Sequence, residues 1–228
     1  MTAQDSRASL GTMVSLSDVS VRYASESRSV VDRFSLEVQK GEFVILLGGS
    51  GSGKTSIFRL LTGEVEPASG KVRIGSNQLP FKRRRDLQRY RQHLGCVFQD
   101  FKLLEEKSVE ENIAFPLRLE GRLNASRLRE RVEQVLSRFG LTQLKDLLPA
   151  RLARGEQQRV AIARAVAQEP LVLLADEPTA QLDERHTETI LSLLCSENAR
   201  GMTVILGTYD PALAARIPSS RVVNLAAR

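Results

Sequence analysis

The chain has 228 residues, of which 42% are hydrophobic and 26% are charged, and both values are close to globular averages. At about 150 residues per domain, this length corresponds to one to one and a half domains, which disfavours repeat arrays and multi-module proteins. The formal net charge of +6 permits contact with anionic lipid or nucleic acid without indicating either. The longest apolar run is far shorter than the roughly 18 residues that a membrane-spanning helix needs.

Cysteine use and the N-terminus bear on the cellular compartment. Cys96 and Cys195 show no CxxC or Cys/His spacing, so the sequence predicts neither a disulfide framework nor a zinc site. This usage is typical of the reducing cytoplasm, and no secretory signal is predicted. We expect residues 1–12 to form a flexible tail ahead of one domain spanning 13–228.

The predicted strands fall into two kinds. Residues 14–23 and 34–39 alternate apolar and polar side chains, a pattern typical of half-buried strands in an antiparallel layer. Residues 43–47 are apolar throughout and precede a Gly/Ser cluster, which indicates a strand buried on both faces of a parallel sheet. Residues 171–175 and 203–206 repeat this second pattern.

Helical periodicity lies between these strands, at 56–61, near 82–92, at 125–141 and at 156–168. Strands that alternate with helices predict an α/β fold with a mostly parallel core sheet. The stretch from about 101 to 154 contains helical segments and no strong buried strand. We therefore expect it to form a helical subdomain inserted between two strands of the sheet.

A phosphate-binding loop is predicted directly after the 43–47 strand. The residues fit the pattern GxxxxGK[ST] between a strand and a helix, and they are Gly48, Gly49, Ser50, Gly51, Ser52, Gly53, Lys54 and Thr55, followed by Ser56. Glycines let the backbone wrap around phosphates, and the backbone N–H groups supply partial positive charge. We expect Lys54 to reach the β- and γ-phosphates and the Thr55 hydroxyl to ligate Mg²⁺.

Two carboxylates, Asp176 and Glu177, end the predicted strand at 171–175 and form a Walker B pattern. Acids at the carboxyl end of a parallel strand lie where such sheets bind ligands. We expect Asp176 to hold the Mg²⁺ shell and Glu177 to act as the general base that faces the attacking water. The alternative, a solvated acidic helix N-terminus, is disfavoured beside a phosphate loop.

From the strand near Val14 to the end of the chain, these motifs resemble the ATP-binding subunit of ABC transporters. Tyr23 matches the family's adenine-stacking aromatic, and Gln99 matches the loop glutamine that touches Mg²⁺ and the transmembrane partner. The signature position is occupied by Ala153, Arg154, Gly155, Glu156 and Gln157, and the D-loop is 180–183, ending in Asp183. The resemblance implies an ABC-type fold, ATP hydrolysis with Mg²⁺, and a homodimer on ATP binding.

Within the family, the run 98–104, the short length and the lone cassette are most similar to the FtsE-type ATPases of cell division. The ATPases of lipoprotein release and macrolide export are similar as well. This resemblance implies an integral membrane partner, for which an FtsX-like permease subunit is the expectation. It also implies a cytoplasmic location, peripheral on the inner face of the cell membrane.

Three positions depart from the family pattern. The signature normally reads Leu-Ser-Gly-Gly, whereas Ala153 and Arg154 stand at its second and third positions, and Tyr209 replaces the switch histidine. In the family each signature closes over the γ-phosphate bound by the partner subunit, and Ala153 lacks the hydroxyl to donate there. Arg154 either obstructs the close approach or binds the phosphate through its guanidinium, and the sequence leaves both open. A phenol does not exchange protons near neutrality as imidazole does, so we expect slow hydrolysis.

A basic run covers 82–85 with Arg89 and Arg91. A solvated helix face is the favoured interpretation, with membrane headgroups or nucleic acid as alternatives. Few aromatic side chains accompany the run, so we expect no nucleic-acid binding. We expect His93 and His186, which show no ligand spacing, to be ordinary surface or packing residues.

Three functions remain at this point. The leading one is an ATPase subunit that dimerises on ATP and drives or gates a membrane partner. The second is an ATP-dependent scaffold in which hydrolysis is nearly lost. The third, a soluble ABC protein of repair or translation, is disfavoured because such proteins usually carry two cassettes or a long coiled-coil insertion.

Overall fold

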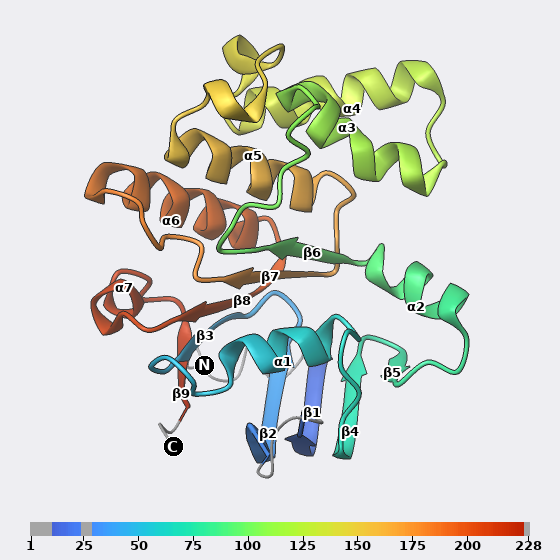
Figure 1. The fold of residues 1–228 in the computed structure, drawn as a ribbon, viewed down its shortest axis with the longest axis vertical. Helices are drawn as coiled ribbons and strands as arrows, with labels where there is room; N and C mark the ends of the chain where they lie inside the picture. Colours follow the sequence, from blue (N-terminus) through green and yellow to red (C-terminus); the bar gives the residue numbers. More distant parts are fainter. Residues whose placement is uncertain (1–10, 24–28, 226–228) are drawn as a thin grey trace, which may run out of the picture.

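The structure, a computed structural model, describes residues 11–23 and 29–225. Most of the tail expected over 1–12 therefore lies outside the described residues, and Thr12 already begins the first strand. Within the described part of the chain, no helix combines the length and the apolar character needed to span a membrane. The elements form two sheets with helices between and around them (Figure 1).

The first sheet is antiparallel, as the alternating patterns predict. Its four strands are β1 (Thr12–Val21), β2 (Val31–Gln39), β4 (Ser69–Ile74) and β5 (Asn77–Leu79), in the order β2-β1-β4-β5. β1 is the central strand, and its apolar residues, such as Val14 and Leu16, are buried. The expectation of an antiparallel layer at the start of the domain is confirmed.

The second sheet is parallel in every pairing. It contains β6 (Leu94–Val97), β7 (Val172–Asp176), β8 (Thr203–Thr208), β3 (Phe43–Leu47) and β9 (Arg221–Asn224), in the order β6-β7-β8-β3-β9. The apolar runs predicted to be buried on both faces form β3, β7 and β8. Since all strands point the same way, their carboxyl ends share one edge of the sheet.

One core fills the space between the two sheets. Helix α1 (Lys54–Leu61) lies there (Figure 1). Its Ile57 and Leu60 belong to the same buried cluster as Val44 and Leu46 of β3. Helix α2 (Arg84–Arg91) adds the buried Tyr90 to the same core. The phosphate-binding loop is thereby anchored at both ends, by β3 before it and by α1 after it.

The other face of β3 packs against a second core. Phe43 and Ile45 join the apolar sides of α5 (Arg154–Val166), α6 (Glu184–Ala199) and α7 (Pro211–Ala215). The helical segment between β6 and β7 extends this core with α3 (Val109–Glu120) and α4 (Ala125–Arg138), followed by short 3₁₀ helices at Thr142–Leu144 and Pro149–Arg151. The prediction of a helical insertion between two sheet strands is confirmed.

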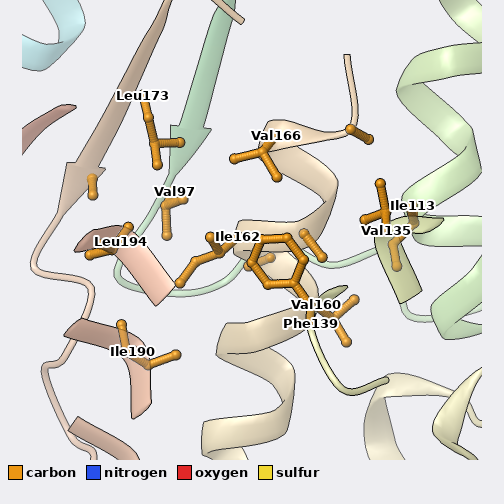
Figure 2. Packing of buried hydrophobic residues seen from close by; sticks show 14 of the residues in the cluster. Val97, Ile113, Val135, Phe139, Val160, Ile162, Val166, Leu173, Ile190 and Leu194 are labelled. Atoms are coloured by element: carbon orange, nitrogen blue, oxygen red, sulfur yellow. The ribbon is translucent and has the colours of Figure 1, made fainter. Parts of the chain in front are cut away.

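Figure 2 shows how the insertion is attached. Ile113 of α3, Val135 of α4 and Phe139 gather beside Val160, Ile162 and Val166 of α5, while Leu173, Ile190 and Leu194 continue the cluster toward the sheet. A capping box begins α3, because the Ser108 hydroxyl accepts from the Glu111 backbone N–H while the Glu111 carboxylate accepts from that of Ser108. Helix α5 is thus the shared wall between the insertion and the parallel sheet.

Candidate functional site

The loop at 48–55 has a geometry that only glycine supports at key positions. Gly51 and Gly53 have positive φ angles of 77° and 94°. A Cβ at Gly53 would lie 2.9 Å from Cγ2 of Val31, and one at Gly48 would lie 2.5 Å from Oγ of Ser52. The loop is therefore compact, and it delivers the first turn of α1 to the carboxyl edge of the sheet.

Lys54 joins this loop to the end of β7. Its ammonium donates to the carbonyls of Gly48 and Gly49, at 2.5 and 3.1 Å, and lies 3.4 Å from Oε1 of Glu177. The residue is only 7% exposed, so the charge is held in place by these partners. The two motifs that the sequence predicts to work together are in contact.

Asp176 and Thr55 form a site suited to a hard cation. Oδ2 of Asp176 accepts from the Thr55 hydroxyl at 2.9 Å, whereas Oδ1 is buried and has no hydrogen-bond partner among the described residues. Burial raises the pKa of Asp176, while the Thr55 hydrogen bond and the nearby positive charge of Lys54 oppose that rise. An unpaired carboxylate oxygen beside a hydroxyl is the donor set that Mg²⁺ prefers, so these residues fit the ion expected from the sequence.

Glu177 is held in an unusual backbone conformation. Its φ angle is 48°, and its N–H donates to the carbonyl of Gly207 at 2.9 Å. For a non-glycine residue this conformation costs on the order of 1–2 kcal/mol. Burial raises the pKa of Glu177, and this rise is opposed by the positive charge of Lys54 and by the backbone N–H of Tyr209. A fixed carboxylate with a raised pKa is suited to accept a proton.

A cavity of about 700 Å³ gathers these groups. Its lining comprises Val30, Gly49, Ser50, Gly51, Ser52, Gly53, Lys54, Thr55, Ser56, Gln99, Asp176, Glu177 and Tyr209. Tyr209 is 62% exposed. Tyr23 does not line the cavity, but its hydroxyl donates to Oγ of Ser56 at 3.1 Å, so its ring lies beside the loop. Val30 is the lining residue that the sequence did not indicate.

A larger cleft of about 880 Å³ lies next to the cavity and shares Thr55, Gln99 and Asp176 with it. The cleft is bounded by α1, by the loop at 98–102 and by the N-terminal end of α5. Its lining combines aromatic side chains, such as Phe98 and Phe101, with charged ones. Of the three shared residues, Thr55 and Gln99 are exposed and Asp176 is half-buried.

The signature residues lie apart from the phosphate loop of the same chain. None of 153–157 lines the cavity around Lys54, although Arg154 and Gln157 line the larger cleft. The Arg154 guanidinium donates to the side-chain carbonyl of Gln181 in the D-loop. The backbone N–H of Ala153 donates to the Glu156 carboxylate at 2.9 Å. In this arrangement Arg154 is bound within its own chain.

Gly155 and Asp183 both contact His186 of α6. A Cβ at Gly155 would lie 2.0 Å from Cδ2 of His186, so no larger residue fits there without movement. Asp183 accepts from the backbone N–H of His186 at 2.8 Å and lies 2.7 Å from Nδ1 of its ring. His186 therefore acts as a packing residue that joins the signature to the D-loop.

Comparison with known proteins gives a consistent result. Residues 31–180 match the family described as ABC transporter. The cell division ATP-binding protein FtsE of Mycobacterium tuberculosis is 44% identical over 198 residues, which cover 87% of this chain and 86% of that protein. The methionine import ATP-binding protein MetN of Geobacillus kaustophilus is 41% identical over 201 residues, and the chain spans 58% of its length.

Solved structures agree with the fold. A dimeric ATP-binding cassette in a post-hydrolysis state bound to ADP and Pi superposes with a TM-score of 0.84 at 32% identity, covering 93% of this chain and 94% of that one. The structure of cbiO1 from Clostridium perfringens, part of an ABC transporter complex, gives a TM-score of 0.84 at 28% identity and covers 94% and 84%. Both sheets and the helical insertion therefore belong to a shared architecture.

Proposed function

Because the chain belongs to the ABC transporter family and is an ATP-binding subunit with ATPase activity, we propose that Mg·ATP closes a homodimer of it and thereby drives or gates an integral membrane partner. The observation that carries this proposal is the cavity in which Lys54, Asp176 and Glu177 meet at the carboxyl edge of the parallel sheet. The dimeric cassette with ADP and Pi among the structural relatives supports it.

The residues of the cavity have separate roles in hydrolysis. The backbone N–H groups of the loop and the Lys54 ammonium bind and orient the β- and γ-phosphates. Thr55, Asp176 and Gln99 would hold Mg²⁺, which neutralises charge on the phosphates when it is bound. Glu177 accepts the proton of the attacking water, and its contact with the Lys54 ammonium keeps that carboxylate in place.

Within the family we propose an FtsE-like role in cell division, with an FtsX-like permease subunit as partner. The support is the match to the mycobacterial cell division protein, which extends over most of both chains. The MetN relative is nearly as similar in identity but longer than this chain. An ATPase of a lipoprotein- or macrolide-type exporter is the alternative, and the identity of the membrane protein that co-purifies distinguishes the two.

The larger cleft is the docking site that we propose for the partner. It places Gln99 between the partner and the nucleotide cavity, so that docking and phosphate binding share one loop. Association with the membrane would then be peripheral and would depend on the partner. In fractionated cells that lack the partner, the protein should leave the membrane fraction; if it persists there, the basic run at 82–91 binds lipid directly.

A second candidate function is an ATP-dependent scaffold in which hydrolysis is nearly lost. The contact of Arg154 with Gln181 favours it, because the guanidinium is engaged within its own chain rather than free for phosphate. Both candidate functions require dimerisation on ATP binding, and sedimentation with Mg·ATP tests this step. We expect Glu177→Gln to form a stable dimer and Lys54→Ala to remain monomeric. A Glu177→Gln protein that stays monomeric at saturating ATP contradicts both.

A further inference from the structure

The loop between β6 and α3 carries Gln99 to the cavity on a strained backbone. Phe101 and Lys102 are consecutive non-glycine residues with φ angles of 57° and 47°. Side chains disfavour this left-handed region, and such conformations persist only where surrounding contacts impose them. Within the loop, the N–H of Phe101 donates to the carbonyl of Phe98 at 3.1 Å, and the N–H of Lys102 donates to the carbonyl of Asp100 at 2.5 Å. These local bonds use the N–H groups of the pair, so they leave the carbonyls of Phe101 and Lys102 to a donor outside the loop.

Arg164 of α5 supplies the outside contact. Its Nη1 donates to the carbonyl of Lys102 at 2.6 Å, and its Nη2 donates to that of Phe101 at 2.9 Å. Both carbonyls of the strained pair are therefore bound by one planar guanidinium, whose fork fixes their relative orientation. Among residues 11–23 and 29–225, no carboxylate forms an ion pair with Arg164. Arg164 is half-buried, and this burial lowers the pKa of its guanidinium.

We propose that Arg164 is a positioning residue that holds Gln99 at the nucleotide cavity by clamping the backbone of Phe101 and Lys102. The inference rests on the proposed function, because it assigns Gln99 to the bound Mg·ATP. The inference gives a role to a residue that belongs to none of the motifs described above, which are the phosphate loop, the Walker B acids, the signature and the switch position. The clamp is positioned by the fold: α5 is fixed by its packing against α3 and the sheet, and its side chain reaches across to the loop.

Arg159 provides a matched control on the same helix. Its Nη1 donates to the carbonyls of Phe139 and Gly140, both at 3.3 Å, so it also binds two successive carbonyls. Its Nη2 lies 3.8 Å from Oε1 of Glu156, an ion pair for which the charge is kept in Arg159→Lys. Those carbonyls lie at the end of α4, and neither they nor Arg159 line the nucleotide cavity or the cleft. Loss of Arg159 therefore reports the cost of removing such a contact without any effect on Gln99.

The first measurement is hydrogen exchange of the backbone amides at 98–103 in the nucleotide-free chain, for wild type, Arg164→Lys and Arg159→Lys. Lysine keeps the charge but lacks the fork, so the fold should be retained. We expect exchange in the loop to accelerate about tenfold in Arg164→Lys and to stay unchanged in Arg159→Lys. Unchanged loop exchange in Arg164→Lys overturns the clamp.

The second measurement separates positioning from stability. We expect Arg164→Lys to raise the Mg²⁺ concentration that half-saturates ATP hydrolysis about fivefold, with ATP affinity in EDTA unaltered. Faster loop exchange together with an unaltered Mg²⁺ requirement overturns the assignment to Gln99. A wild-type chain that hydrolyses no ATP refutes the proposed enzymatic function instead, and the exchange measurement then decides the clamp by itself.

Discussion

Two edges of the molecule each carry a basic side chain, which is buried at one edge and exposed at the other. At the phosphate edge, formed by 48–56 with Asp176 and Glu177, the cation Lys54 is 7% exposed and has carbonyl and carboxylate partners. At the signature edge, formed by 153–157 with Gln181, the cation Arg154 is exposed and contacts one amide. All three departures from the family pattern, at Ala153, Arg154 and Tyr209, are exposed positions.

The difference shows what the fold of one chain determines. The phosphate edge is completed by contacts within the chain, so a substitution there leaves a buried group without its partner. The fold places no comparable demand on the side chains of Ala153 and Arg154, although Gly155 beside them is restricted by His186. We therefore expect substitutions at Ala153 and Arg154 to change ATP hydrolysis by the assembled dimer rather than the stability of the fold.

The strongest test of the phosphate edge is Glu177→Gln. Because removal of a general base commonly costs 10²–10⁴ in rate, we expect turnover to fall about 10³-fold, or to background if the wild type is slow. Single-turnover ATP hydrolysis measures it, with Glu110→Gln as the control because Glu110 lies on α3 and lines neither hollow. Equal rates for wild type and Glu177→Gln would show that the base lies elsewhere.

The pH dependence of kcat gives a second test of Glu177 as the general base. Since burial raises the pKa of Glu177, the acid limb of kcat should lie at higher pH than for an exposed glutamate. A raised native pKa also means that the folded state binds the proton more readily than the unfolded state, so stability falls as pH rises through that range. Glu177→Gln removes this titration, so its Tm should depend less on pH than that of the wild type, although the variant also deprives the buried Lys54 ammonium of its carboxylate partner.

Lys54→Ala tests the phosphate edge through binding. The variant loses the buried ammonium that faces the phosphates, and hydrogen bonds to charged groups contribute about 1.5–3 kcal/mol, so affinity for Mg·ATP should fall about 10²-fold. Calorimetry measures the change, and Lys107→Ala is the control because Lys107 is exposed and paired only with Glu111. If both variants bind ATP like the wild type, the phosphate-loop assignment is wrong.

We expect the three residues that depart from the family pattern to limit the rate of ATP hydrolysis. Each lost charge-stabilising donor commonly costs 10²–10³ in rate, so Ala153→Ser, Arg154→Gly and Tyr209→His together should raise kcat at least about tenfold. Steady-state ATPase assays of the triple variant and of each single variant test this. Should the wild type be fast and Arg154→Gly slow it, Arg154 binds phosphate across the dimer and the scaffold candidate fails.

Gly155→Ala gives the smallest expected effect. A Cβ there would overlap the ring of His186, which is half-buried and would have to shift away from its contact with Asp183, so we expect a loss of about 1 kcal/mol in unfolding free energy. Gly11→Ala is the control, since a Cβ at Gly11 meets no atom of residues 11–23 or 29–225 within 4 Å. Chemical denaturation measures both. A Gly155→Ala protein as stable as Gly11→Ala would show that the signature is not packed against α6.

The sequence predicts the elements whose pattern is local and strong. The apolar run at 43–47 coincides with β3, and the phosphate loop and Walker B acids are read from adjacent residues. β6 and β4 were missed because one is short and the other has an exposed polar first half. α6 was also missed, since polar residues interrupt its apolar face.

The contacts that the sequence did not predict join residues far apart in the chain. Arg164 with the carbonyls of Phe101 and Lys102, and Arg154 with Gln181, are brought together only by the packing of α5 against its neighbours. Nothing in the local spacing distinguishes Arg164 from Arg159 on the same helix. The motif residues are therefore predictable from the sequence, and the residues that orient them are not.

The buried, unpaired Oδ1 of Asp176 has a consequence for the lifetime of the protein. Among the described residues no donor contacts this oxygen, so Mg²⁺ bound with ATP would supply a partner that the fold does not. Ligands that bind only the folded state raise its stability in proportion to the logarithm of their concentration once that exceeds the dissociation constant. At 100 times the dissociation constant this gain is about 2.7 kcal/mol, which lowers the unfolded population about a hundredfold. In starved cells, in which ATP falls, the unfolded population would rise, and proteases would degrade this protein faster than in cells with ample ATP.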